Sequence, residues 1–418
     1  MKRFLRSVID LLTPASKAKR RKRVQSGPEL LESRVLLTAE YKLVRDIFTG
    51  ADTEGSRPDH FTQVGSSTFF TATTPSGGME LWKTNGTTNG TSLVKDIRPG
   101  LRGSDPMSLT NVNGVLYFTA DDGMNGRELW KSDGTVGGTV LVRDILAGPS
   151  GSNPSELTNF SGQLYFAANT VTGGQELWTT NGTSVGTTQV IDINAGDIGS
   201  DPHSLKATSS GLYFAADDGT NGPELWSTGS TSQGTVMVAD IFPGPNNGSA
   251  PGGLTNVNGI VYFAANDGTH GRELWVSNGT QAGTMLLKDI NVGSANGAFY
   301  PKITLLGNGK ALFAADDGVN GTELWITDGT TAGTQLFKNI ATGVASSNPD
   351  SFKKLTTGEV LFSAYSYDGG QELWKTDGTD AGTKLVKDIV PGVGSSEPSN
   401  LTLADNKIFF TTSQMTYT

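Results

Sequence analysis

The chain contains no cysteine, which excludes disulfide bonds and thiolate metal sites, so its stability must come from packing. It also has no apolar run long enough to cross a membrane as a helix. Charged residues make up only 17% of the 418 residues, and helix-forming residues are sparse after the first forty positions. Glycine is abundant, with 55 residues, which favours many short strands joined by tight turns. The composition therefore predicts an all-β protein.

Charge is distributed unevenly along the chain. Residues 1–40 hold 10 lysines and arginines against 4 acidic residues, whereas the remainder holds 22 against 37. An acidic body of this kind disfavours nucleic acid as a partner and suits a soluble or cation-associated surface.

All the tryptophans end Glu-Leu-Trp triplets that recur every 48 to 50 residues. A fixed period in this range indicates a repeat architecture, in which each unit buries its apolar faces against its neighbours. We therefore interpret residues 40–418 as one array of repeats. The repeat tryptophans are Trp82, Trp130, Trp178, Trp226, Trp275, Trp325 and Trp374.

The second complete unit predicts four strands, at about residues 106–112, 115–120, 127–132 and 139–145. Asn113-Gly114 suits a two-residue hairpin turn, since both residues tolerate positive φ. Pro149 and Pro154 flank the connection to the next unit, and proline cannot donate to a strand ladder. Four-stranded antiparallel meanders joined by such crossovers predict a β-propeller.

The two ends of the array match complementary parts of one unit. Residues 41–47 match the fourth strand, and residues 401–412 match the first and second strands. Pairing these ends would close the ring and cover exposed sheet edges. We predict eight blades, seven complete and one hybrid, with a short or absent third strand around residues 415–418. A ring of seven blades with an appended hairpin is the alternative.

Residues 1–39 are predicted to form a basic leader outside the propeller. The run Lys17–Arg23 is typical of a solvated targeting tail, with a nucleic-acid patch or nuclear signal as the alternative. Residues 30–39, Leu-Leu-Glu-Ser-Arg-Val-Leu-Leu-Thr-Ala, resemble the LEPR-XLL motif, with Ser33 in place of its proline. That motif lies near the N terminus of large exported or surface proteins of planctomycete-type bacteria. The resemblance implies an export or sorting leader, and a short amphipathic helix is the alternative.

The repeats themselves resemble a known family. Glu-Leu-Trp-x-x-Asp-Gly-Thr is intact at residues 128–135, 323–330 and 372–379, and looks like the ELWxxDGT repeat, which is similar to hyalin repeats. Asparagine replaces the aspartate at Asn85, Asn181 and Asn278, and the fourth unit reads Gly229-Ser230-Thr231. The resemblance implies a bacterial secreted or cell-surface protein, often part of a larger adhesive molecule, with no established catalytic residues.

Two kinds of repeat residue have competing structural and functional interpretations. The tryptophans could stack on sugars, but an indole in the same strand of every blade is what packing between blades requires, and we predict packing. Glu80 and its equivalents are expected to form ion pairs with the basic residue of the fourth strand, such as Lys95, and not to act in catalysis.

Paired carboxylates in glycine-rich loops are the candidate metal ligands, because calcium takes six to eight oxygen ligands. The order Asp-Asp-Gly-x-Asn-Gly matches neither an EF-hand nor a calcium β-roll, so turn formation is the competing explanation. We predict no cofactor, with calcium as the alternative. The candidate ligands are Asp121, Asp122, Asp217, Asp218, Asp267, Asp316 and Asp317.

We identify no catalytic residues from the sequence. Zinc-protease, nucleophile-elbow and Walker motifs are absent, and His60, His203 and His270 lie in different units. We therefore predict a non-enzymatic, monomeric propeller, exported or at the cell surface, that acts as a structural or adhesive module for protein or polysaccharide. One alternative is a carbohydrate-active hydrolase or lyase, which would gather unlike carboxylates, arginine or histidine at one mouth of the channel. A calcium-dependent adhesion protein is the other.

Overall fold

The computed structural model describes residues 6–10, 44–48, 55–229, 234–298, 302–307, 309–404 and 407–412. The predicted basic run at 17–23, the LEPR-XLL-like segment at 30–39 and the expected third strand near 415–418 lie outside these ranges. Among the described residues, no helix has the length and hydropathy needed to cross a membrane.

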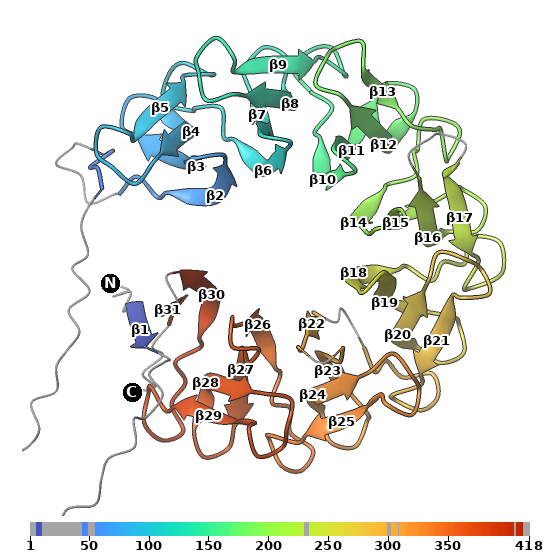
Figure 1. Ribbon diagram of the computed structural model, residues 1–418. Coiled ribbons are helices and arrows are strands. Elements are labelled where there is room, and N and C mark those ends of the chain that lie inside the picture. Colours follow the sequence, from blue (N-terminus) through green and yellow to red (C-terminus); the bar gives the residue numbers. More distant parts are fainter. Residues whose placement is uncertain are drawn as a thin grey trace, which may run out of the picture.

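The described chain forms eight antiparallel sheets around an open centre (Figure 1). Seven of these sheets have four strands each, in chain order, and one has three. The prediction of an eight-bladed, all-β propeller is therefore confirmed. Each blade begins with the strand nearest the centre and ends with the strand at the rim (Figure 1).

The first blade consists of β2 (Asp59–Val64), β3 (Ser67–Thr74), β4 (Gly78–Thr84) and β5 (Ser92–Lys95). The second consists of β6 (Met107–Val112), β7 (Val115–Asp121), β8 (Arg127–Ser132) and β9 (Val140–Arg143). The third consists of β10 (Ser155–Phe160), β11 (Gln163–Thr170), β12 (Gly174–Thr180) and β13 (Thr187–Gln189). The next two consist of β14 (His203–Ala207), β15 (Leu212–Asp217), β16 (Pro223–Thr228) and β17 (Val236–Ala239); and β18 (Gly252–Val257), β19 (Ile260–Asn266), β20 (Arg272–Ser277) and β21 (Met285–Lys288). The remaining complete blades are β22 (Thr304–Leu305), β23 (Ala311–Asp316), β24 (Thr322–Thr327) and β25 (Gln335–Lys338); and β26 (Asp350–Lys354), β27 (Val360–Ser366), β28 (Gly370–Thr376) and β29 (Lys384–Lys387). The hybrid blade contains β30 (Ser399–Ala404), β31 (Lys407–Thr411) and β1 (Arg6–Asp10).

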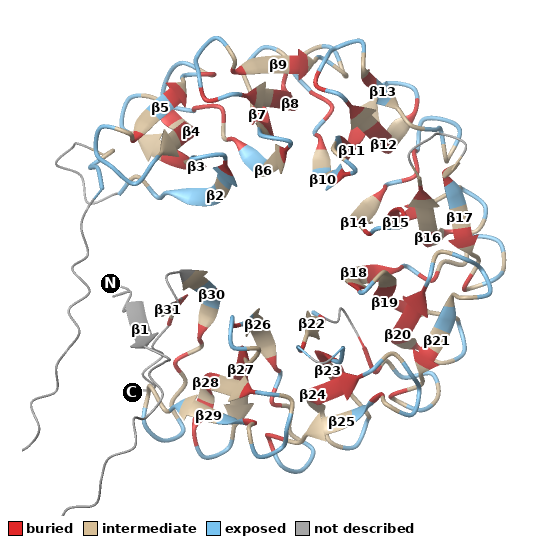
Figure 2. Ribbon diagram, viewed as in Figure 1, coloured by how far each residue is buried: buried red, intermediate tan, exposed pale blue. Residues whose placement is uncertain are grey.

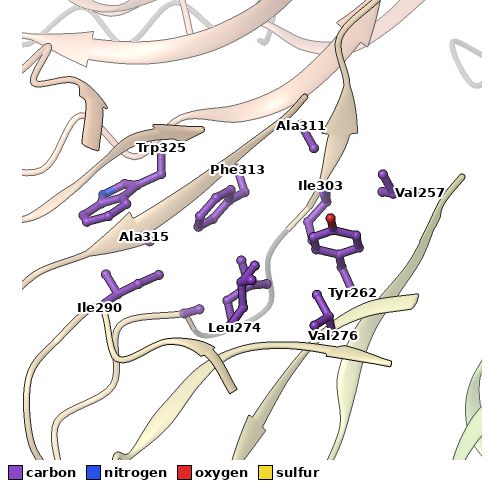
Figure 3. Close-up of a cluster of buried hydrophobic side chains, with 12 residues drawn as sticks. Val257, Tyr262, Leu274, Val276, Ile290, Ile303, Ala311, Phe313, Ala315 and Trp325 are labelled. Carbon is purple, nitrogen blue, oxygen red and sulfur yellow. The ribbon is translucent and has the colours of Figure 1, made fainter. Parts of the chain in front are cut away.

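The hydrophobic core is a series of clusters, each filling the space between two neighbouring blades. Leu81 of the first blade and Trp130 of the second belong to one cluster, and Leu129 and Trp178 belong to the next. Leucine therefore faces the following blade and tryptophan the preceding one. Buried residues concentrate on the second and third strands of the blades (Figure 2). In the cluster of Figure 3, Trp325 lies beside Phe313 and above residues of the preceding blade. The indoles thus lie between the blades.

The glutamate of each triplet anchors the crossover to the next blade. Glu80 is 2% exposed, and its carboxylate accepts hydrogen bonds from Ile97 N (3.2 Å), Arg98 N (3.0 Å) and Ser104 N (2.9 Å). The hydroxyl of Ser104 also donates to it. The buried carboxylate thereby satisfies donors of an irregular segment that has no strand partner.

The predicted ion pair between this glutamate and the fourth-strand lysine is wrong. Lys95 Nζ donates instead to Thr139 O of the next blade, at 2.8 Å, and lies 5.8 Å from the centre of the Trp130 ring. A carboxylate that already accepts four hydrogen bonds needs no cation, whereas the ammonium gains a carbonyl and an aromatic face.

The hybrid blade contains segments from both ends of the chain, but the predicted pairing of residues 41–47 with residues 401–412 is not found, because the described residues 44–48 form no strand. Residues 44–48 lie along the first blade, where Arg45 Nη1 donates to Thr91 O, the counterpart of the contact between Lys95 and Thr139. Ile47 packs against the cluster that contains Trp82. Two details differ from the prediction. Residues 44–48 are not a strand, and the third-strand position beside β31 is taken by β1, whose residue Ser7 pairs with Phe410. Residues 6–10, predicted to belong to a leader outside the propeller, are thus part of its hybrid blade.

Candidate functional site

Seven of the innermost strands begin with the same distortion. In β2, β6, β10, β14, β18, β26 and β30 the register shifts near the start, and the second residue has a φ between 54° and 67°. Such β-bulges re-aim side chains at the edge of a sheet. The left-handed conformation costs roughly 1 kcal/mol or more for any residue other than glycine, and such strain concentrates at functional sites. These second residues are His60, Ser108, Glu156, Ser204, Gly253, Ser351 and Asn400.

The bulges carry residues that differ from blade to blade, although the rest of the unit repeats closely. The first residues of the same strands are Asp59, Met107, Ser155, His203, Gly252, Asp350 and Ser399. His60 and His203, which the sequence places in different units, both lie in this inner set. The central opening is therefore where the otherwise regular array carries blade-specific chemistry (Figure 1).

The innermost strands together form what we call the inner wall, and three hollows lie along one part of it. The largest, of about 480 Å³, lies between β26 and β30 and is lined by Asp350, Tyr365, Gln371 and Glu397 among others. A second, of about 250 Å³, is lined by Lys302 and Asp350, and a third, of about 390 Å³, lies between β14 and β18. Since Asp350 lines the first two and Lys302 the last two, the hollows form a continuous series.

An ion pair stands in the middle of this series. Lys302 Nζ lies 2.8 Å from Asp350 Oδ1 and 3.1 Å from Oδ2. Both side chains are about half exposed or more, at 70% and 49%, so water screens the pair and its contribution to stability is small. Its charges are accordingly available to a ligand in the hollows.

The crossover backbone fixes the other side of the largest hollow. Glu397 N donates to Gln371 O at 3.2 Å, and Glu397 has a φ of 46°. The side-chain amide of Gln371 donates to Ser363 Oγ at 2.8 Å. Asp350 begins the seventh blade and Glu397 belongs to the crossover that follows it, so tertiary structure alone brings the two residues to one hollow.

The predicted metal ligands lie in loops that use their carboxylates internally. Asp122 Oδ1 accepts hydrogen bonds from Met124 N and Asn125 N, both at 2.8 Å, while Asp121 pairs with Arg98. Desolvation raises the pKa of Asp122, but the hydrogen bonds from Asn125 and Met124 outweigh it and hold the pKa below its usual value. The same pattern holds for Asp218, Asp267 and Asp317. Asp217 and Asp316 accept from Gly219 N and Gly318 N.

These loops belong to separate blades. Within the described ranges, no three histidine or acidic side chains are grouped so that they could hold a metal ion. The prediction therefore stays that of no cofactor, with calcium binding at these aspartates as the alternative.

The fifth blade departs from the others at two titratable groups. His270 replaces the loop asparagine, and its Nδ1 lies 2.7 Å from Asp267 Oδ2, a hydrogen bond that raises the pKa of His270. Gly297 replaces the crossover serine, so Glu273 accepts hydrogen bonds from backbone N–H groups without a serine hydroxyl. Burial raises the pKa of Glu273 to about 7.

This shift predicts a pH-dependent stability. Between the ordinary glutamate pKa of 4.5 and about 7, the folded protein holds a proton on Glu273 that the unfolded chain has released, so the free energy of unfolding falls as pH rises through this window. We expect Glu273→Gln to remove this dependence. In urea unfolding, the free energy of unfolding of the wild type minus that of the variant should be more positive at about pH 5 than at about pH 8. An equal difference at both pH values would contradict the raised pKa.

No sequence pattern indicates that Lys302, Asp350, Tyr365 and Glu397 belong together. One signal was present, since the residue that follows the second crossover proline varies from unit to unit, as Asp59, Met107 and Asp350 show. Variation at one position of an otherwise uniform repeat marks a position that packing does not determine.

Comparison with known proteins found no matching family model and no matching curated protein. Solved structures that match include a prolyl endopeptidase (12% identity, TM-score 0.45, covering 78% of this chain and 49% of that one) and a puromycin hydrolase variant (12%, 0.41, 74% and 58%). A further match is a catalytically inactive virginiamycin B lyase from Staphylococcus aureus (17%, 0.40, 74% and 95%). The chain thus spans about half to three-fifths of the length of these peptidases.

This comparison corrects the prediction of a non-enzymatic structural or adhesive module. The matching structures include hydrolases and a lyase, and a TolB from Acinetobacter baumannii matches as well. At these identities and scores the likeness concerns the arrangement of strands, and it transfers no active site to this chain. The residues of the inner strands therefore decide which chemistry this protein can perform.

Proposed function

We propose that the protein is a hydrolase or lyase that acts on a polysaccharide, with its active site in the hollow between β26 and β30. The observation that carries the proposal is that two acidic residues, Asp350 and Glu397, line one hollow of about 480 Å³. Its volume is in the range of small-ligand sites, roughly 300 to 1,000 Å³. Tyr365 and Gln371 line the same hollow and supply neutral hydrogen-bonding groups.

Two carboxyl groups are the usual requirement for cleaving a glycosidic bond. One donates a proton to the leaving oxygen, and the other activates water or attacks the sugar carbon. We assign the acid role to Glu397. Asp350, whose negative charge faces the ammonium of Lys302, takes the role of base or nucleophile. The hydroxyl of Tyr365 and the amide of Gln371 are placed to bind sugar hydroxyl groups.

The open centre supports a polymeric substrate. The three hollows follow one another along the inner wall, so a chain of several sugar units could contact all of them. The export implied by the LEPR-XLL-like segment fits a substrate outside the cell. We therefore also propose that the protein acts after export, which fractionation of cells expressing the full chain would test: recovery entirely in the cytosol would contradict it.

Activity is tested by incubating the full chain with a panel of neutral and acidic polysaccharides and measuring new reducing ends. We expect cleavage by the wild type, and a loss of about a hundredfold or more in both Asp350→Asn and Glu397→Gln, since general acid–base groups contribute on the order of 10²–10⁴ in rate. Asp380→Asn, which removes the exposed carboxylate beside Lys338, is the matched control and should retain activity. Equal rates in Asp350→Asn and wild type, or no cleavage of any substrate, would overturn the proposal.

A further inference from the structure

A bulge of the inner wall binds a carboxylate from the neighbouring blade. Glu156 of β10 accepts a hydrogen bond from Leu205 N of β14 in the next blade, at 3.1 Å. Leu205 directly follows Ser204, the residue with positive φ in its own bulge. Successive backbone N–H groups around a left-handed residue form a concave site for anions. The protein therefore contains, between its third and fourth blades, a carboxylate bound at such a site.

The next pair of blades repeats this backbone without the carboxylate. The register of β14 shifts between His203 and Lys206, and that of β18 shifts at the corresponding place, between Gly252 and Thr255. Leu254 of β18 thus corresponds to Leu205, and the residue that corresponds to Glu156 is Ser204, whose side chain is too short to reach across. A hollow of about 390 Å³ lies at this point.

The side chains around this hollow favour an anion. Its lining includes Lys206 and Lys302 together with Ser204 and Thr255, and no acidic residue. This is unusual in an array with 37 acidic and 22 basic residues over residues 41–418. Lys302 is also paired with Asp350, in an exposed ion pair that a ligand can share. Two lysines and a backbone N–H lining one hollow are a suitable set of donors for a carboxylate, because charge-assisted hydrogen bonds are the stronger ones.

We infer that the hollow between β14 and β18 binds a carboxylate of the substrate through Leu254 N–H, Lys206 and Lys302, and hence that the substrate is a polysaccharide containing uronic acid. The substrate class rests on the proposed function, whereas carboxylate binding does not. The series of hollows connects this subsite to Asp350 through Lys302. The bound uronate therefore lies in a different part of the polysaccharide from the glycosidic bond that is cleaved.

The repeat supplies a matched pair of substitutions for the test. Ser204→Glu places a carboxylate where Glu156 stands in the preceding blade, at a backbone φ of 58° against 59° for Glu156. The new side chain should occupy Leu254 N–H and repel other anions. Ser108→Glu makes the same change at the corresponding bulge of the second blade, with a φ of 54°, away from both lysines. The two variants add the same charge and the same backbone strain.

Binding is measured by calorimetry on the full chain carrying Glu397→Gln, with trigalacturonate as the probe and its methyl ester as the uncharged counterpart. We expect trigalacturonate to bind, the ester to bind at least about tenfold more weakly, and Ser204→Glu to weaken trigalacturonate binding by about tenfold or more, with Ser108→Glu unchanged. Lys206→Gln should weaken it comparably, and Lys384→Gln, a change on the outer strand β29, should not.

The outcomes separate this inference from the proposed function. Cleavage of polysaccharide without preference for trigalacturonate over its ester, or equal binding by the Ser204→Glu and Ser108→Glu proteins, would overturn the carboxylate subsite and leave the hydrolase or lyase standing. Binding with the expected pattern of variants, together with no cleavage by the wild type, would support the subsite and overturn the catalytic proposal.

Discussion

Replacing Glu128 with glutamine is expected to lower the free energy of unfolding by about 3 kcal/mol. The Glu128 carboxylate is fully buried and accepts hydrogen bonds from Leu146 N, Ser152 N and the hydroxyl of Ser152. Glutamine has the same shape but turns an NH₂ group toward these donors. At least one buried donor then loses its acceptor, and no water can replace it. Urea unfolding at neutral pH measures the effect.

The control for this change is Glu359→Gln. Glu359 pairs with Lys375 at 2.8 Å on a partly exposed surface. Its loss should cost less than about 1 kcal/mol, as is usual for exposed pairs. If the Glu128 and Glu359 variants were equally stable, the buried glutamate would not be the anchor of the crossover.

Replacing Trp178 with alanine is expected to cost about 3 to 5 kcal/mol. The Trp178 side chain is 6% exposed and packs in the cluster that contains Leu129 and Val142 of the preceding blade. The guanidinium of Arg143 lies 5.7 Å from the centre of its ring. Truncation removes these contacts and leaves a cavity between two blades, which rigid sheets cannot close.

The matched control is Val185→Ala in the loop that follows β12. Val185 is 91% exposed, so this change should alter stability by less than about 0.5 kcal/mol. Thermal and urea unfolding of both variants would measure the difference. A Trp178 variant as stable as the Val185 variant would mean that the indoles do not hold the blades together, and would reopen the interpretation of the tryptophans as a binding surface.

The regularity that reveals the fold also concealed the candidate site. Repeated residues such as Trp130 and Glu128 dominate the sequence pattern, and the structure gives them packing and anchoring roles. Residues that occur once, such as Lys302 and Glu397, have no pattern to mark them. The repeated residues therefore favoured the prediction of a non-enzymatic module.

The ion-pair error has a related cause. Glu80 and Lys95 lie on adjacent strands, and sequence spacing alone gives no indication that a crossover folds back over Glu80. The crossover contributes its backbone N–H groups, which are common to nearly all residue types and leave no signature in sequence. The lysine reaches instead into the next blade, a contact between residues 44 positions apart.

The amino-acid sequence was sufficient for the β class, the boundaries of the repeating unit and the eight blades, but not for the way in which the two ends of the chain meet. The β class, the unit boundaries and the number of blades follow from local turn chemistry and from a pattern that occurs seven times, so one irregular unit does not obscure it. The tertiary structure alone decides which blade-specific residues face one another. Asp350 and Glu397 are 47 positions apart, and only the folding of the crossover beside the seventh blade brings these two acidic residues to one hollow. Packing between blades depends on residues that every unit shares, whereas the chemistry of the inner wall depends on the differences between units, and those differences acquire meaning only when the ring is assembled.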